Sequence, residues 1–87
     1  MKAAHQKAAA AFGEVLKTLR DGAGLSQEDL AEKVDVDRTY PSLLELGKRS
    51  PTLPMFLRIS DAIEIDPVVL LRMTIRRMEV EDETKGS

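Results

Sequence analysis

The sequence predicts an all-α fold in which five helices share one core. Only 3% of the residues are aromatic although 43% are apolar, so the core must consist of leucine, isoleucine, valine, methionine and alanine. Such a composition suits packed helices better than a sheet. Apolar residues recur at intervals of three and four along most of the chain, as they do on one face of a helix. Capping residues and prolines separate these stretches into five segments of helical length.

The length of 87 residues indicates one domain with a modest core. The absence of cysteine excludes a disulfide framework and a cysteine-based metal site, and it is compatible with a reducing compartment. The apolar runs are much shorter than the ~20 residues of a membrane span. Residues 1–11 lack the hydrophobic centre of a signal peptide. We therefore expect a cytoplasmic protein that does not enter a membrane.

The acidic excess is concentrated at the end of the chain. The whole sequence has 13 basic and 15 acidic residues, a formal charge of −2. Residues 79–87 hold four of the acids and one of the bases, so the remainder has 12 bases, 11 acids and a charge of +1. Nucleic-acid binders usually carry a basic surface, and a body this weakly basic predicts weak nonspecific affinity for DNA.

The first helix is expected over residues 2–21, whose alanine-rich start has high helix propensity. Its inward face is formed by apolar residues at helical spacing, namely Phe12, Val15, Leu16 and Leu19. Two glycines in the segment 21–24 end it. His5 stands alone with no accompanying ligand or base motif, and we expect it to be a surface residue.

The stretch 25–51 predicts two short helices joined by a tight turn. Ser26 is a good N-cap for the first of them, and Asp29 three residues later completes an imperfect capping box, since glutamate or glutamine is preferred there. Leu30 and Val34 lie one turn apart and face the core.

The next helix is expected to open at Arg38 with Asp37 as its cap. It buries Leu44, together with Pro41, and it ends at Gly47, the usual residue beyond a helix C-terminus. Two short helices with about three residues between them are the helix-turn-helix pattern.

Two further helices complete the set. Thr52 caps the fourth, with Pro54 in its first turn, and this helix runs to about residue 62 or 64. Its expected core positions are Leu53, Phe56, Leu57, Ile59 and Ile63. Asp66 and Pro67 open the fifth helix as cap and first-position proline, and it is expected to end between residues 78 and 83.

The fifth helix carries more apolar residues than one buried face requires. We expect residues 68–71 to be core, whereas the later apolar residues have no evident partner within the chain. Among these, Met73, Ile75 and Met78 are predicted to form a homodimer interface, which Val80 extends. The domain is expected to span residues 1–78, and residues 79–87 to form an acidic, disordered tail.

Residues 10–72 resemble the lambda-repressor-like, or XRE-type, helix-turn-helix domains. The resemblance is carried by Phe12-Gly13, Leu16, Leu19-Arg20, Gly24-Leu25-Ser26-Gln27, Leu30-Ala31, Val34, Val36, Ser42, Leu44-Glu45, Gly47-Lys48 and Pro51. It implies a five-helix lambda-repressor-like domain with helices two and three as the helix-turn-helix. It also implies that helix three is the recognition helix, which enters the major groove of DNA.

The resemblance assigns roles to individual residues. The positions that match base-reading residues are Arg38, Thr39, Tyr40 and Leu43. The positions that match phosphate-binding residues are Gln27, Ser42, Lys48 and Arg49. Gln27 would also brace the recognition helix, and Arg20 and Glu45 match a structural ion pair between the first and third helices. Independently, an arginine such as Arg38 can bind guanine O6 and N7 with roughly 1–3 kcal/mol of discrimination.

Three positions depart from the family pattern. Asp35 stands where relatives place glycine, at a turn that needs positive φ, and aspartate tolerates this conformation better than most residues. Pro41 replaces the usual valine or isoleucine and forfeits one helical hydrogen bond. Leu43 and Leu46 are apolar where polar DNA-contacting side chains are common.

The leading hypothesis is a sequence-specific transcriptional regulator that binds double-stranded DNA as a homodimer. Its operator would be a pseudo-palindrome with half-sites ~34 Å apart. The alternative is a protein-interaction module of the same fold, antitoxin-like or an adaptor. This alternative is favoured by the apolar Leu43 and Leu46 and by an acidic group made of Glu28, Asp29, Glu32, Asp35 and Asp37. No catalytic constellation, metal site, cofactor site or small-molecule site is evident, and we expect no enzymatic activity.

Overall fold

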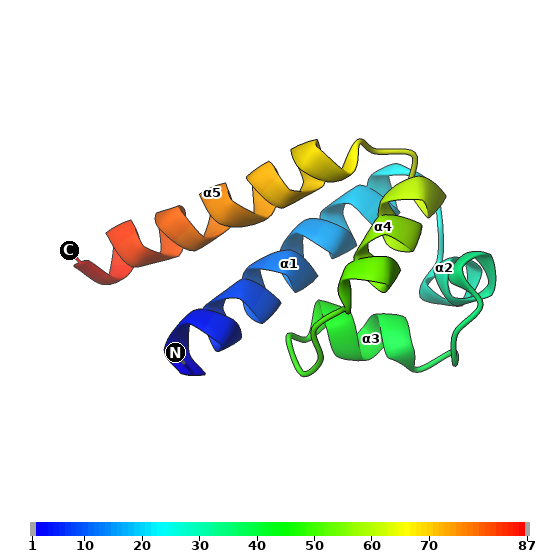
Figure 1. Cartoon of the computed structure of the whole chain (residues 1–87), viewed down its shortest axis with the longest axis horizontal. Helices are drawn as coiled ribbons and strands as arrows, with labels where there is room; N and C mark the ends of the chain where they lie inside the picture. Colours follow the sequence, from blue (N-terminus) through cyan, green and yellow to red (C-terminus); the bar gives the residue numbers. More distant parts are fainter. Residues whose placement is uncertain (1, 87) are drawn as a thin grey trace.

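The structure is a computed structural model that describes the backbone of residues 2–86 and the side chains of residues 6–80. Its five helices are α1 (Lys2–Gly22), α2 (Gln27–Val34), α3 (Tyr40–Glu45), α4 (Leu53–Ala62) and α5 (Pro67–Gly86), and residues 2–86 contain no strand. Helix α1 contacts α3 and α5, while α2 and α4 pack on one another (Figure 1). The predicted all-α architecture is confirmed.

One apolar cluster joins all five helices. It consists of Phe12, Val15, Leu16, Leu30, Val34, Leu44, Ile59, Ile63 and Leu70. The only aromatic pair among the described side chains is Phe12 with Phe56, whose ring centroids are 5.7 Å apart. The core therefore depends on aliphatic residues, as the composition indicates.

Local signals set the ends of α2. The Ser26 hydroxyl accepts a hydrogen bond from the Asp29 N–H at 2.9 Å, and Asp29 Oδ2 accepts one from the Ser26 N–H at 2.9 Å. This is the predicted capping box, complete in both directions. The helix ends at Asp35, which has a φ of 57° in the left-handed region. Asp35 thus adopts the conformation for which relatives use glycine.

Helix α3 begins two residues later than the sequence indicates. It starts at Tyr40 rather than Arg38, and its first helical backbone bond joins the Leu43 N–H to the Thr39 carbonyl. Pro41 explains the difference, because it has no N–H to donate to the carbonyl of Asp37. The N-cap is therefore Thr39 rather than the predicted Asp37, and it makes no side-chain cap hydrogen bond. Asp37 instead holds the preceding turn, since its side chain accepts the Thr39 N–H at 3.0 Å.

The connection from α3 to α4 follows the predicted signals. Gly47 has a φ of +73°, and a Cβ there would lie 3.1 Å from the Cα of Ala10, so both conformation and space favour glycine. Thr52 caps α4 by accepting the Met55 N–H at 3.3 Å.

The faces of α4 and α5 differ from expectation. Leu53 and Leu57 were expected in the core but are 71% and 47% exposed. Of residues 68–71 only Leu70 is buried, whereas Val68 and Leu71 are 61% and 50% exposed. These helices carry apolar residues on more than one side, and only the position of the neighbouring helices decides which side is covered.

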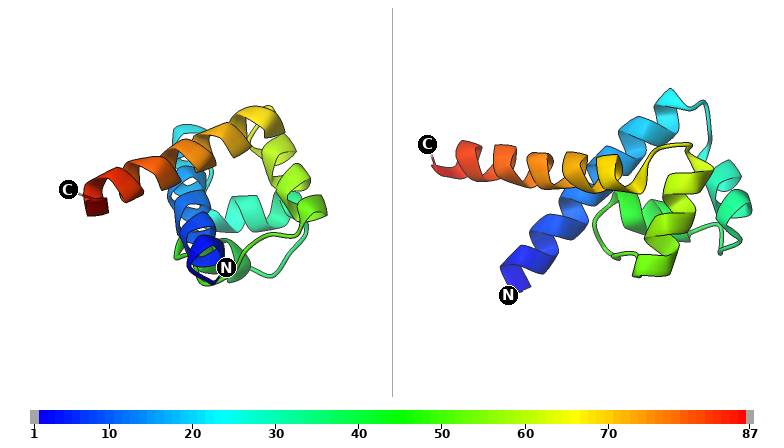
Figure 2. Two further views of the ribbon diagram at one scale, coloured as in Figure 1. Left: turned by 60° about the vertical axis from the view of Figure 1, so that its left-hand side comes forward. Right: turned by 45° about the horizontal axis from the view of Figure 1, so that its top comes forward.

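The end of α5 also departs from the sequence interpretation. The helix continues to Gly86, through nearly all of the segment 79–87 that we expected to form a tail. Its C-terminal half projects away from the other helices (Figures 1 and 2). Met73 is half-buried and packs against the core, and its place in a homodimer interface stays a prediction. Ile75 is 46% exposed and Met78 is half-buried.

Candidate nucleic-acid interface

The carboxylate of Glu45 fixes α3 to the rest of the domain. It accepts hydrogen bonds from Arg20 Nε at 2.6 Å and Arg20 Nη2 at 3.1 Å, and from the Gln27 amide at 3.0 Å. Arg20 also donates to the carbonyl of Leu25 at 2.7 Å. The Arg20 and Glu45 side chains are only 9% and 4% exposed. The hydrogen bond to Glu45 raises the pKa of the Arg20 guanidinium above its ordinary value. Helices α1, α2 and α3 thus meet at one carboxylate.

The turn that leads into α3 presents Arg38 and Thr39 to solvent. Arg38 Nη2 donates to Glu28 Oε1 of α2 at 2.8 Å. The Thr39 hydroxyl donates to Asp37, which leaves its oxygen lone pairs and its methyl group for other contacts. These bonds from Thr39 hold the pKa of the Asp37 carboxyl below its ordinary value.

The predicted base-reading residues further along α3 are less exposed. Tyr40 and Leu43 are half-buried, and Tyr40 packs partly against the core. The Arg49 guanidinium lies 5.8 Å from the centroid of the Tyr40 ring, within the range of a cation–π contact. The Tyr40 ring therefore contacts the loop after α3 through Arg49.

The predicted phosphate-binding residues fall into two groups. Lys48 and Arg49 are exposed in the loop after α3, and their N–H groups donate to the carbonyl of Leu43 at 2.9 and 3.3 Å. These two hydrogen bonds to one carbonyl anchor the basic loop to α3. Ser42 is half-buried, and the half-buried Gln27 directs its amide at Glu45. Gln27 therefore braces α3 in this structure, and its contact with DNA stays a prediction.

Sequence reasoning noticed the acidic group on α2 and the following turn and assigned Asp29 to the capping box, but it missed the partner of Glu28. Glu28 pairs with Arg38, Asp29 belongs to the capping box, and Asp37 holds Thr39. Three of the five acids that favoured a protein-interaction module therefore have partners within the domain. The Glu28–Arg38 pair joins α2 to the turn before α3, and the only sequence signal for it was the opposite charge of the two residues.

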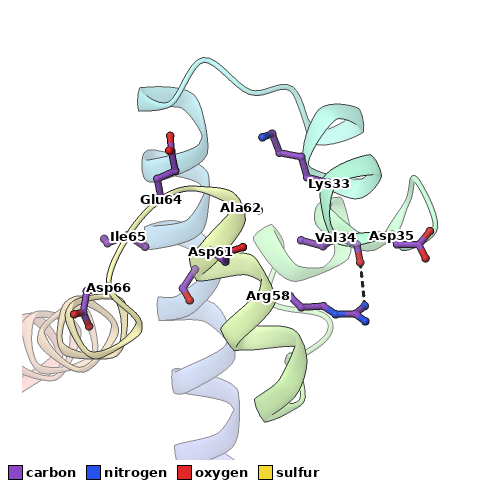
Figure 3. A pocket seen from close by; sticks show the side chains of 10 residues that line it. Lys33, Val34, Asp35, Arg58, Asp61, Ala62, Glu64, Ile65 and Asp66 are labelled. Atoms are coloured by element: carbon purple, nitrogen blue, oxygen red, sulfur yellow. Dashed lines mark hydrogen bonds between the residues drawn. The ribbon is translucent and has the colours of Figure 1, made fainter.

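A separate open groove lies between the C-terminal ends of α2 and α4 (Figure 3). Its charged lining residues are Lys33, Asp35, Arg58, Asp61, Glu64 and Asp66. Arg58 Nη1 donates to the carbonyl of Val34 at 3.3 Å, the dashed line in Figure 3. None of the predicted DNA-contacting residues lines this groove.

Among the described residues, no group of three His, Cys, Asp or Glu side chains is arranged to hold a metal ion. Within the same part of the chain, every helix is too short or too polar to cross a membrane.

Comparisons with known proteins give one consistent answer. A family model described as helix-turn-helix matches residues 16–70. Control protein C.MunI from Mycoplasma sp. is 46% identical over 55 residues, which are 62% of this chain and 74% of that protein. The controller protein C.BamHI from Bacillus amyloliquefaciens is 38% identical over 64 residues, covering 72% of this chain and 79% of the relative.

A solved structure of a restriction-modification controller is also similar. The C.Esp1396I tetramer in complex with its natural 35 base-pair operator is 34% identical with a TM-score of 0.73, and the match covers 82% of this chain and 93% of that one. That relative was solved as a tetramer bound to operator DNA.

Proposed function

Because this chain belongs to the helix-turn-helix family, we propose that it is a transcriptional regulator that binds a specific sequence of double-stranded DNA as a homodimer. In this proposal α3 enters the major groove and the turn before it meets the base edges. The protein acts in the cytoplasm, and its function involves no catalytic step, cofactor or small-molecule ligand.

The observation that carries the proposal is the placement of side chains suited to DNA contact at both ends of a firmly held helix. Arg38 and Thr39 are exposed in the turn just before α3, and Lys48 and Arg49 are exposed just beyond its end. The hydrogen bonds to Glu45 hold α3 against α1 and α2, so these side chains keep a fixed spacing. A rigid scaffold of this kind lowers the entropic cost of binding.

The side chains divide into base-reading and backbone-binding groups. We assign base contacts to Arg38 and Thr39, with Tyr40 and Leu43 further along the helix as additional contacts. Lys48 and Arg49 supply charge for the phosphate backbone, which positions the protein without reading sequence. Ser42 and Gln27 complete the backbone contacts. The relative C.Esp1396I, which was solved on its operator, supports this class of partner.

The homodimer is proposed to form through one apolar stripe on α5. The stripe consists of Val68, Leu71, Ile75 and Met78, which are spaced by three, four and three residues and so share a helix face. Leu70 and Thr74 are buried on another side of the same helix. Ile75 and Met78 belong to the stripe as predicted, and we add Val68 and Leu71 because of their exposure. Met73, the third predicted interface residue, lies on another face of the helix and stays a separate prediction.

Dimerisation would also compensate for the weak charge of the body. One copy offers few basic side chains, and a second copy doubles the contacts on a two-fold symmetric operator. The regulator would then respond to its own concentration, because only the dimer binds tightly.

The proposal is tested by selecting bound duplexes from a random pool with the purified full chain. The expected result is an enriched site with two-fold symmetry and half-sites about one helical turn apart. An enriched site without symmetry would contradict the homodimer, and the absence of any enriched site would contradict DNA recognition itself.

A further inference from the structure

Glu28 and Arg38 form an ion pair at the edge of the proposed recognition surface. The Arg38 Nη2 to Glu28 Oε1 distance is 2.8 Å, and the two side chains are 78% and 70% exposed. The residues are ten apart in sequence and meet because the turn between α2 and α3 brings Arg38 back beside the first turn of α2. So exposed a pair contributes little to stability. We therefore look for the effect of the pair in the DNA groups that Arg38 can contact.

From this geometry we infer that Glu28 is a specificity-determining residue. Its carboxylate positions the Arg38 guanidinium for the edge of a base and disfavours the use of the same guanidinium on a phosphate. The inference rests on the proposed DNA-binding function and adds to it an acidic residue that makes no DNA contact of its own.

The donor inventory of arginine makes both effects possible. A guanidinium has five N–H donors, and the bond to Glu28 uses one of them. The remaining donors suffice for a bidentate contact with guanine O6 and N7, which are uncharged acceptors. A phosphate carries a full negative charge, and the Glu28 carboxylate repels it at the same place. The carboxylate therefore penalises a phosphate contact more than a guanine contact.

Restraint of the side chain acts in the same direction. A long arginine loses rotamer freedom when it binds, and a side chain that is already held loses less. Asp37 holds the neighbouring Thr39 through the backbone N–H at 3.0 Å and the hydroxyl. Both residues at the start of α3 are thus held by carboxylates before DNA arrives.

The test compares binding to the selected operator and to a scrambled duplex of equal length, at several salt concentrations. The variant is Glu28→Gln. Its matched control is Glu32→Gln, which removes the same charge from an exposed position one turn further along α2. Thermal unfolding of each variant checks that the fold is intact. Both changes are repeated in an Arg38→Ala background, so that the coupling between Glu28 and Arg38 is measured directly.

Glu28→Gln is expected to lower the ratio of operator to scrambled affinity about three- to tenfold, a part of what a bidentate arginine contact provides. It should also steepen the salt dependence on the scrambled duplex by about one phosphate contact. Glu32→Gln should change both affinities by the same factor. In the Arg38→Ala background Glu28→Gln should leave the ratio unchanged.

Three outcomes would overturn the inference. If the wild type prefers the operator and Glu28→Gln keeps the same preference, the inference alone fails and the proposed function stands. If Glu28→Gln lowers the preference equally with and without Arg38, Glu28 acts by another route. If the wild type binds both duplexes equally, the proposed function fails and the inference fails with it.

Discussion

Arg20 of α1 and Glu45 of α3 are separated by 25 residues, yet two hydrogen bonds of 2.6 and 3.1 Å join them inside the domain. Glu45 also receives the amide of Gln27 from α2. The orientation of α3 relative to the other two helices therefore depends on one buried carboxylate.

Removal of one partner of this pair should destabilise the domain. Arg20→Ala leaves the Glu45 carboxylate buried without its main counter-charge, and the expected loss is about 3–5 kcal/mol in the free energy of unfolding. Urea unfolding followed by circular dichroism measures it. Arg38→Ala, which removes an exposed arginine, is the control and should change stability by less than about 0.5 kcal/mol. Equal effects of the two substitutions would show that the buried pair has no special role.

The capping box of α2 predicts a pH dependence. The backbone N–H of Ser26, and then its side chain, lower the pKa of Asp29 below its ordinary value of 3.8. A carboxyl with a lowered folded-state pKa stabilises the fold above its unfolded pKa, and this contribution is lost as the pH falls through the folded value. Wild type should therefore exceed Asp29→Asn in stability at neutral pH, and the difference should shrink below pH 3.8. The free energy of unfolding of both proteins is measured with urea at neutral pH and below pH 3.8. An equal difference between the two proteins at the two pH values would contradict this assignment.

Substitution of Arg38 and substitution of Lys48 should weaken DNA binding in different ways. Arg38→Ala is expected to weaken operator binding by roughly 1–3 kcal/mol and to relax the preference at one base pair of each half-site. Competition binding with single-base operator variants measures both effects. A uniform loss across all operator variants would assign Arg38 to the phosphate backbone instead.

Lys48→Ala should weaken binding to every duplex by a similar factor. The slope of log affinity against log salt should decrease by about one, because one phosphate contact is lost. Titrations of operator and scrambled duplex at several salt concentrations provide the measurement. An unchanged slope would mean that the exposed Lys48 does not reach the backbone of the DNA.

The α5 stripe predicts the oligomeric state. Ile75→Asp combined with Met78→Asp should give a folded monomer with much weaker operator binding, since charge on the stripe opposes its burial. Val69→Asp is a matched control, because Val69 is 43% exposed but lies on a different face of the helix. Sedimentation should show the monomer mass for the double variant only. Retention of a dimer would place the interface elsewhere.

Local chemistry let the sequence alone determine much of the fold. Ser26 and Thr52 cap α2 and α4 as expected, and Asp35 and Gly47 adopt left-handed conformations just beyond the ends of α2 and α3. Each of these features depends on a few neighbouring residues and on backbone geometry that short segments encode. The family resemblance added the residue roles, including the pairing of Arg20 with Glu45.

Tertiary structure decided which faces are covered and which charges meet. The periodicity of α5 could not choose between Leu70, which is buried, and Val68 and Leu71, which are exposed, because the helix is apolar on several sides. The same ambiguity explains why Leu53 and Leu57 were expected in the core although both are exposed. The Glu28–Arg38 contact joins α2 to the turn before α3, and the hydrogen bond from Gln27 to Glu45 joins α2 to α3. Such contacts depend on the angles at which helices pack, and these angles follow from the whole core rather than from any single segment.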